Sequence, residues 1–466
     1  MSDHVGALLD AAARRAPGAP AIIWDGGALS WGELERRAGG FARSLARRGV
    51  KPGHRIALSI SNRWTFVVAL WGGLKCGATV APLNPLLTPD ERARVVAHLG
   101  PAVVVDTVGE EVAEWPSVSA TDAPALILYT SGSTGQPKGA VLSHRALAFS
   151  NRSWAEPVMA LRPEDRVLAA LPFSHSYGLN GALLAPLQAG VPVVLLERFS
   201  PDDALDVIAR HRVTVFPGVA TMFRRLLDSP RLAGADLSSV RHALSGAAPC
   251  PWDLAQEWRT RTGIRILRGY GMTELFRPVS YLANEETDLP DAIGRPVPGV
   301  QARAVDDAGR ALAPGEIGEL WIKSPAAMDG YLDAPEETRA VLDDGWFKTG
   351  DLVRLSHDGF VSIVGRKREL ILRGGYSVFP AEVEAALLAH PAVAEAAVIG
   401  VAHAELGEDV LAYATLRAGS TADPEQLIAH CKARLAAYKY PRRVIIVDEL
   451  PKGATGKILK SRLPGP

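Results

Sequence analysis

Residues 126–144 read LILYTSGSTGQPKGAVLSH, two strand-like runs on either side of a polar loop. The apolar runs Leu126–Tyr129 and Ala140–Ser143 have the composition of buried strands. Between them, residues 130–139 are rich in Gly, Ser and Thr. Glycines allow successive backbone N–H groups to converge on an anion, and the hydroxyls add donors. This pattern predicts a phosphate-binding loop, although it lacks the GxxxxGK[ST] spacing of the common P-loop.

Helix-like and strand-like patterns alternate on both sides of this loop. Residues 29–49 have apolar residues at helical spacing. Ser200 followed by Pro201 is typical of a capped helix start, and we expect that helix to end at His211, before a strand over 213–216. Such alternation predicts an α/β fold with a largely parallel sheet. Further strands or helices are expected at 55–60, 64–73, 220–227, 240–244, 252–261 and 264–267.

The pattern changes towards the C-terminus. From about Ala292 to Val364, short strands alternate with Gly-, Pro- and Asp-rich turns, which predicts a small barrel-like β unit. The last hundred or so residues predict a compact α+β unit. Because 466 residues exceed one compact core, we expect a large N-terminal core domain over 1–365 and a small, mobile C-terminal domain over 366–466. The elements expected in the C-terminal domain are a helix from Pro380, strands at 395–401, 409–416 and 443–447, and a helix at 424–437.

The composition excludes several classes of protein. The 51 Lys and Arg residues balance 51 Asp and Glu, so the basic excess of a nucleic-acid or membrane-surface binder is absent. Cys76, Cys250 and Cys431 form no CxxC pair, which disfavours a zinc cluster or a disulfide framework. The sequence has no apolar run of signal-peptide or membrane-spanning length. We therefore expect a cytoplasmic protein that binds neither nucleic acid nor membranes.

The loop TSGSTGQPKG at 130–139 resembles the signature of the adenylate-forming superfamily, which includes acyl-CoA synthetases, firefly luciferases and the adenylation domains of peptide synthetases. Four later segments resemble further motifs of this family in the same order: GYGMTE at 269–274, FKTGD at 347–351, the segment 365–384, and PKGATGK at 451–457. Five ordered matches do not arise by chance, so the chain is identified as a member.

The resemblance implies how ATP is bound. Lys138 and the loop donors hold the β- and γ-phosphates, and Asp351 accepts the ribose hydroxyls, with Arg366 close to the same sugar. Glu274 helps to bind Mg²⁺, which favours one or two carboxylates together with phosphate oxygens. The residues implied to contact ATP or AMP are Thr130, Ser131, Gly132, Ser133, Thr134, Gly135, Lys138, Gly246, Ala247, Ala248, Tyr270, Gly271, Met272, Thr273, Asp351, Arg366 and Lys457.

The resemblance also implies which residues act on the reacting groups. Lys457 bridges the attacking carboxylate and the α-phosphate, and a lysine ammonium is a compact charge suited to this role. The C-terminal domain is expected to alternate between two poses about a hinge at Arg368. One pose inserts Lys457, and the other presents Gly374 and Gly375 to the incoming thiol. Residues assigned to catalysis are Lys457, His175, Thr273 and Glu274.

The segment LPFSHSYGLNGAL at 171–183 is similar to that beside the carboxylate pocket of 4-coumarate–CoA ligases. This similarity implies an aromatic, cinnamate- or benzoate-like acid, with room for its ring beside Ser176, Gly178 and Gly181. Arg268 departs from those ligases. It either meets a second polar group on the substrate or pairs with a nearby carboxylate. The predicted acid pocket comprises His175, Ser176, Tyr177, Gly181, Arg268 and Gly269.

These motifs predict an AMP-forming carboxylate–CoA ligase that uses ATP, Mg²⁺ and CoA. The alternative is a stand-alone adenylating enzyme that delivers the acid to a carrier protein or to another nucleophile. A nucleotide-binding scaffold with a dead site is disfavoured because Lys138, Glu274, Asp351 and Lys457 are all present. An oxidoreductase is disfavoured because no GxGxxG follows an early strand. The protein is expected to be a monomer or a homodimer.

Overall fold

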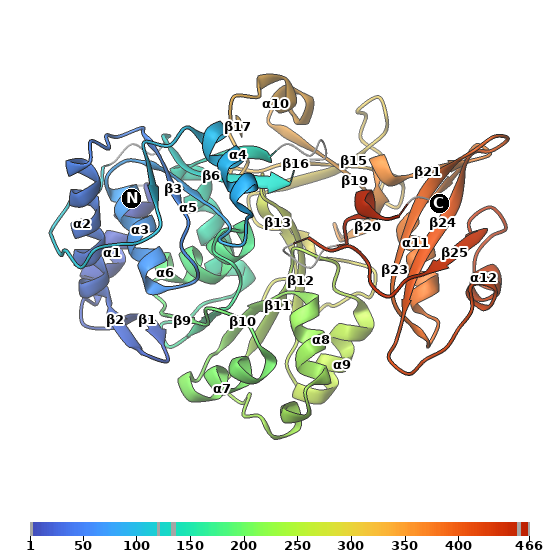
Figure 1. The fold of residues 1–466 in the computed structure, drawn as a ribbon, viewed down its shortest axis with the longest axis horizontal. Helices are drawn as coiled ribbons and strands as arrows, with labels where there is room; N and C mark the ends of the chain where they lie inside the picture. Colours follow the sequence, from blue (N-terminus) through green and yellow to red (C-terminus); the bar gives the residue numbers. More distant parts are fainter. Residues whose placement is uncertain (1–2, 119–121, 132–136, 454–457, 465–466) are drawn as a thin grey trace. The chain divides into compact units, whose positions relative to one another are not determined.

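The computed structural model describes residues 3–118, 122–131, 137–453 and 458–464 (Figure 1). The chain forms two compact units, Met1–Gln301 with Ile322–Phe347, and Ala302–Trp321 with Lys348–Pro466. In this division, residues 302–321 and 348–365, which we predicted to lie in the N-terminal core domain, group with the C-terminal part of the chain. The boundary predicted at residues 365 and 366, and the mobility of the C-terminal domain, stay predictions.

The first unit is built on a nine-stranded sheet in the order β14-β13-β12-β11-β10-β8-β9-β1-β2. Its central strands, β12 to β1 in this order, are parallel, and β2, β13 and β14 are antiparallel additions. The predicted α/β fold with a largely parallel sheet is confirmed. The strands are β1 (Pro20–Trp24), β2 (Gly27–Ser30), β8 (Val167–Ala169), β9 (Val193–Leu195), β10 (Val215–Gly218), β11 (His242–Ser245), β12 (Ile266–Met272), β13 (Phe276–Ser280) and β14 (Arg295–Pro296).

A second sheet of the first unit has the order β17-β7-β6-β4-β3-β5. Strands β3 to β6 are parallel, whereas β7 and β17 are antiparallel to their neighbours. This sheet carries the predicted phosphate-binding loop between β6 and β7. Its strands are β3 (Arg55–Leu58), β4 (Thr79–Pro82), β5 (Val103–Val105), β6 (Pro124–Ser131), β7 (Pro137–Ser143) and β17 (Gly330–Tyr331).

The helices of this unit begin where the local sequence favours it. Ser200 caps α7 by accepting a hydrogen bond from Asp203 N, and Pro201 occupies its first turn. The apolar face predicted on α2, which includes Leu34 and Leu45, is buried. The helical segments are α1 (Val5–Arg15), α2 (Trp31–Arg47), α3 (Trp64–Lys75), α4 (Pro89–Leu99), α5 (His144–Ser153), the π-helices η1 (Trp154–Val158) and η2 (Gly178–Leu184), α6 (Ala185–Ala189), α7 (Pro201–His211), α8 (Ala220–Asp228), η3 (Pro230–Gly234), α9 (Trp252–Thr262) and α10 (Pro335–Val341).

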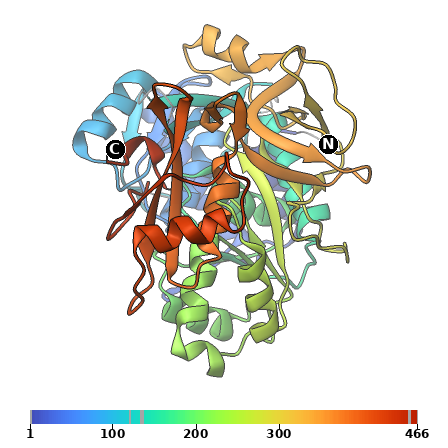
Figure 2. The same ribbon diagram turned by 90° about the vertical axis from the view of Figure 1, so that its right-hand side faces the viewer.

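The second unit ends in a sheet in the order β22-β21-β24-β23, with β25 parallel to β24. Helices α11 and α12 pack on each other and on this sheet (Figure 2). A core that includes Val383, Leu387, Leu427 and Cys431 lies between them. The elements are β21 (Ile371–Arg373), β22 (Tyr376–Val378), α11 (Pro380–Leu388), β23 (Val393–His403), β24 (Gly407–Leu416), α12 (Pro424–Lys432), β25 (Arg443–Ile446) and the short helices η4 (Lys367–Glu369) and η5 (Lys460–Arg462).

A third sheet has the order β15-β16-β19-β18, with β20 paired to β19. Its antiparallel pairs, such as β19 with β20, agree with the small β unit predicted from the turn-rich sequence. No helix among the described residues is long and apolar enough to cross a membrane. The strands of this sheet are β15 (Gln301–Val305), β16 (Ile317–Lys323), β18 (Leu342–Asp343), β19 (Trp346–Leu355) and β20 (Val361–Arg366).

Candidate functional site

The predicted phosphate-binding loop is the tip of a hairpin. Thr130 on β6 lies opposite Lys138 on β7, and Tyr129 lies opposite Gly139. This pairing fixes the start and the end of the loop. Thr130 and Lys138 are both half-buried. The predicted ATP contacts Gly132, Ser133, Thr134 and Gly135 lie outside the described residues.

Tyr331, which the sequence analysis missed, connects the loop strand to Glu274. Its strand β17 pairs with β7, and its hydroxyl donates a hydrogen bond to Glu274 Oε1 over 2.8 Å. Lys138 Nζ lies 5.4 Å from the centre of the Tyr331 ring. Burial, together with the Glu274 charge, raises the pKa of the Tyr331 phenol, so it remains a hydrogen-bond donor. No recognised motif marks Tyr331; only the strand pairing places it here.

Glu274 lies in the turn between β12 and β13, where it remains half-buried. Its carbonyl accepts a hydrogen bond from Met328 N over 2.8 Å, so both its backbone and its side chain are held. The described residues contain no group of three or more His, Cys, Asp or Glu side chains arranged to hold a metal. One fixed, accessible carboxylate fits Mg²⁺, which takes most of its ligands from phosphate and water.

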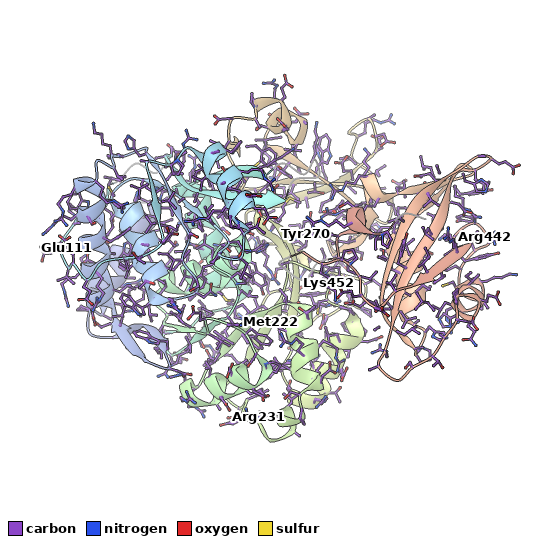
Figure 3. The ribbon with its side chains drawn as sticks, in the orientation of Figure 1. Glu111, Met222, Arg231, Tyr270, Arg442 and Lys452 are labelled. Carbon is purple, nitrogen blue, oxygen red and sulfur yellow. The ribbon has the colours of Figure 1, made fainter. Side chains whose placement is uncertain are left out.

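Two predicted nucleotide-binding segments leave the same edge of the nine-stranded sheet. Ser245 at the end of β11 lies opposite Arg268 on the parallel strand β12. Gly246–Ala248 and Gly269–Glu274 therefore emerge side by side at the carboxyl ends of these strands, where open α/β sheets bind ligands. Tyr270 lies on β12 in this segment (Figure 3). Ala247 has φ of +64°, a left-handed conformation that is costly for a residue with a side chain.

The ring of Tyr177 lies beside this edge. Its hydroxyl donates to Leu244 O over 3.1 Å, and its ring stacks on Trp154 with 5.3 Å between ring centres. Burial raises the pKa of Tyr177 to about 12, so the phenol stays protonated. Trp154 begins η1, and Tyr177 immediately precedes η2. Such π-helical turns often occur at functional sites.

His175 keeps an unprotonated ring nitrogen. Its Nδ1 accepts a hydrogen bond from Tyr177 N over 3.2 Å, and burial lowers its pKa below the ordinary value. The predicted room beside the glycines is absent, however. A methyl group at Gly181 would lie 2.9 Å from the Trp154 ring, and one at Gly178 would collide with the backbone of Pro172. These glycines permit close packing within the protein and do not leave space for a substrate ring. Ser176 is also buried.

The two predicted ribose-binding residues lie together in the second unit. Asp351 on β19 is opposite Arg366 on β20, and Arg366 Nε lies 3.0 Å from Asp351 Oδ1. The Thr349 hydroxyl accepts from Asp351 N and donates to Leu320 O, which holds the turn before Asp351. Asp351 is 3% exposed.

The predicted acceptor-side and hinge residues also lie in this unit. Gly374 and Gly375 form the two-residue turn between β21 and β22, with φ of +56° and +83°. Both angles favour glycine, as in a type I′ turn. Arg368 is exposed on η4. Lys457 lies outside the described residues, between Lys452 and Ile458, which form an antiparallel bridge.

Residues 9–123 and 108–332 match the family model of the AMP-binding enzymes, and residues 382–457 match that of the AMP-binding enzyme C-terminal domain. The chain belongs to the AMP-binding enzyme family. The predicted resemblance to adenylate-forming enzymes is thereby confirmed.

Relatives of this AMP-binding enzyme match it over nearly its whole length. A feruloyl-CoA synthase from Amycolatopsis sp is 36% identical over 97% of this chain and 96% of its own. The 4-coumarate–CoA ligase 5 of Oryza sativa subsp. japonica is 34% identical over 94% of this chain and 89% of its own. The ATP-bound crystal structure of MatB from Rhodopseudomonas palustris superposes with a TM-score of 0.92, at 34% identity, covering 99% of this chain and 98% of that one. The protein is an ATP-dependent, AMP-forming acid–CoA ligase, as the sequence predicts.

Arg268, one of the residues assigned to the acid pocket, has a structural partner in this AMP-binding enzyme. It is 3% exposed, and its Nη2 lies 2.8 Å from Asp288 Oδ1. It also donates to Pro290 O over 2.9 Å and lies 4.8 Å from the Trp252 ring centre. Of the two alternatives for Arg268, the structure therefore shows the pairing with a nearby carboxylate. Its guanidinium is taken up by contacts within the protein.

A second arginine of the AMP-binding enzyme, Arg277, was not singled out from the sequence. It lies on β13, three residues after Glu274, and its guanidinium fills the space in front of Gly269. The guanidinium carbon of Arg277 lies 4.8 Å from the centre of the Trp154 ring. Phe276, which precedes it, has φ of +55°. The sequence gives one signal, an arginine directly after a recognised motif, but nothing in the sequence shows that it turns back over Gly269.

Proposed function

We propose that the acid activated by this ligase is aromatic, of the cinnamate or benzoate kind. The observation that carries the proposal is the similarity over nearly the whole chain to a feruloyl-CoA synthase and to a 4-coumarate–CoA ligase, both named for aromatic acids. The stacked Trp154 and Tyr177 rings are buried, so they form the aromatic wall behind Gly246 at the carboxyl edge of the nine-stranded sheet.

The proposed reaction has two steps. A carboxylate oxygen of the acid attacks the α-phosphorus of ATP, the bond to the β-phosphate breaks, and pyrophosphate leaves. The thiol of CoA then attacks the carbonyl carbon, and AMP leaves with the carboxylate oxygen that made the first bond. Lys457 neutralises charge between the carboxylate and the α-phosphate in the first step.

We assign nucleotide contacts to residues in each of the two units, and the local contacts of each residue are described within its own unit. Lys138 and Thr130 bind the β- and γ-phosphates, and Asp351 with Arg366 bind the ribose. Glu274, held by Tyr331, binds Mg²⁺ together with phosphate oxygens. The bound Mg²⁺ supplies neutralisation of the charge on the departing pyrophosphate.

The remaining assignments carry over from the sequence. His175 lies next to the acid pocket as a neutral side chain, and Gly374–Gly375 form the turn towards the acceptor thiol. Arg368 is the hinge for the C-terminal domain. A carrier protein is the second candidate acceptor, supported only by the family resemblance. Cytoplasmic location and a monomeric or homodimeric state stay predictions.

The experiment is acid-dependent pyrophosphate release from MgATP over a panel of aromatic and aliphatic acids, with and without CoA. Thioester is measured in the same reactions by mass spectrometry. We expect a strong response to one or a few aromatic acids, increased by CoA and accompanied by the acyl-CoA. Pyrophosphate release without thioester would move the acceptor to a carrier protein. A preference for aliphatic acids throughout would overturn the proposed acid class.

A further inference from the structure

Three arginines among the described residues are less than a tenth exposed. Two of them have carboxylate partners: Arg268 with Asp288 at 2.8 Å and Arg373 with Asp409 at 2.7 Å. Arg277, 6% exposed, is different, because no Asp or Glu oxygen of the described chain lies within ion-pair distance of it. A buried guanidinium normally has a counter-ion, since desolvation without one is costly.

The groups that contact the Arg277 guanidinium in the described chain are uncharged, and they include the hydroxyl of Tyr177. Its Nε donates to Ser280 Oγ over 3.0 Å, its Nη2 to Leu267 O over 3.0 Å, and its Nη1 to Ser245 O over 3.3 Å. The ring of Trp154 lies over it at 4.8 Å. These contacts position the guanidinium but do not neutralise it. Burial lowers the pKa of Arg277, in agreement with an uncompensated charge.

Arg277 lies at the edge of the sheet where open α/β folds bind ligands. Its guanidinium would collide with any side chain at Gly269, and its Nη1 would lie 3.2 Å from a methyl group at Gly246. Both glycines lie at the carboxyl ends of parallel strands, the edge at which α/β sheets bind ligands. A second unsatisfied group adjoins it, because the buried Trp154 Nε1–H has no acceptor among the described residues. An anionic group with two oxygens would offset the charge of Arg277 and could accept from Trp154 Nε1–H.

We propose that Arg277 binds a second anionic group, a carboxylate or a sulfonate, carried by the acid that this enzyme activates. The inference rests on the proposed function, since it assumes that the acid enters at this edge. A planar guanidinium matches two oxygens of such a group. The acid is then a dianion, with one carboxylate that is adenylated and one anionic group that stays bound to Arg277. Removing the charge of Arg277 should therefore penalise dianionic acids selectively.

The test uses pairs of acids that differ in the second anionic group: benzoate with isophthalate, and butanoate with succinate. For the wild type and Arg277→Gln, kcat/KM is measured for each acid by pyrophosphate release. Thermal stabilisation of each protein by each acid in the presence of MgATP is measured in parallel. Arg277→Lys keeps the charge without the planar fork. Arg268→Lys is the matched control, because that buried arginine already pairs with Asp288.

We expect the wild type to prefer the dianionic member of a pair. Arg277→Gln should lose about 10- to 100-fold in kcat/KM for the dianion, the range for a hydrogen bond to a charged group, and change little for the monoanion. For the dianion, kcat/KM of Arg277→Lys should lie between the values of the wild type and Arg277→Gln. Arg268→Lys should keep the wild-type preference for the dianion. Equal use of both members by the wild type, or an equal loss for both in Arg277→Gln, would overturn the proposal. An equal loss would mean that Arg277 binds the reacting carboxylate or acts structurally.

Thermal stabilisation separates this inference from the proposed function. Without turnover of any acid, the proposed function fails. The inference still stands if dianions alone stabilise the wild type and Arg277→Gln loses that effect. It fails if dianions and monoanions stabilise equally. If Arg277→Gln does not fold, Arg277→Lys replaces it in both measurements. A loss in Arg277→Lys that is confined to the dianions supports the proposal, and an equal loss for dianions and monoanions overturns it.

Discussion

The Tyr331 hydroxyl donates to Glu274 Oε1 over 2.8 Å, while Lys138 Nζ lies 5.4 Å from the centre of the same tyrosine ring. One side chain thus connects the residue proposed to hold Mg²⁺ with the lysine proposed to hold the outgoing phosphates. Strand β17 makes this possible because it pairs with β7, the strand that begins next to the phosphate-binding loop. We therefore expect Tyr331 to position both residues.

Replacing Tyr331 by Phe should weaken the use of MgATP. A hydrogen bond to a carboxylate contributes about 1.5–3 kcal/mol, so we expect about a tenfold or larger rise in the Mg²⁺ concentration needed for half-maximal pyrophosphate release. Because the pKa of Tyr331 is raised, the difference from the wild type should be the same at neutral and mildly alkaline pH. Tyr129→Phe is the control, since that hydroxyl contacts His98 Nδ1 at 2.9 Å and no carboxylate. An unchanged Mg²⁺ requirement in Tyr331→Phe would contradict the positioning role.

Replacing Arg268 by Met should affect stability and leave acid preference unchanged. The substitution leaves the buried Asp288 carboxylate without its closest partner, and breaking a buried ion pair costs about 3–5 kcal/mol. The measurement is the free energy of unfolding in urea, together with the acid panel. A stable Arg268→Met enzyme with altered acid selectivity would return Arg268 to the substrate pocket.

Replacing Lys457 by Ala should remove adenylation and spare the second step. Loss of one preorganised charge typically costs about 10²- to 10³-fold in rate. We therefore expect pyrophosphate release to fall by that factor, while thioester formation from supplied acyl-adenylate stays near the wild-type rate. Lys460→Ala is the control, because Lys460 pairs with Glu369 at 2.9 Å and with Glu384 at 2.7 Å. Normal pyrophosphate release with loss only of thioester formation would show that the role of Lys457 is different.

The stacked rings of His4 and His144, 3.7 Å apart, should make stability depend on pH. Burial lowers the pKa of His4 from 6.5 to about 4 and that of His144 from 6.5 to about 3. As the pH falls, the unfolded chain therefore takes up these protons before the folded chain does. The free energy of unfolding is highest above pH 6.5 and decreases as the pH falls towards 4. The decrease is up to about 1.4 kcal/mol per pH unit for each histidine. Unfolding in urea at a series of pH values tests this.

The control for the histidine pair is the double variant His4→Gln with His144→Gln. It removes both titrating rings from the contact between α1 and α5, so its stability should vary less with pH than that of the wild type. An equally steep pH dependence in the double variant would assign the effect to other groups.

Local sequence was enough to predict features that depend on neighbouring residues in the chain. The serine cap of α7 and the apolar face of α2 follow from hydrogen bonding and periodicity over one or two turns. The motif order also predicted that Asp351 and Arg366 act together, and they pair on adjacent strands.

Contacts between distant segments could not be predicted in this way. Nothing local places Tyr331 beside β7, or turns Arg277 over Gly269. Gly39 shows the same limit: a methyl group there would collide with the carbonyl of Ala113, so this mid-helix glycine is explained only by the packing of a distant loop on α2. Gly181 was misinterpreted for the same reason, since Trp154 fills the space expected for a substrate ring.

Oxygen labelling shows whether the enzyme transfers an acid to CoA through its adenylate. The preferred acid, labelled with ¹⁸O in both carboxylate oxygens, is converted with MgATP and CoA, and the products are analysed by mass spectrometry. We expect one ¹⁸O atom in AMP, one in the acyl-CoA, and none in pyrophosphate. Label in inorganic phosphate with formation of ADP, or AMP without label, would contradict it.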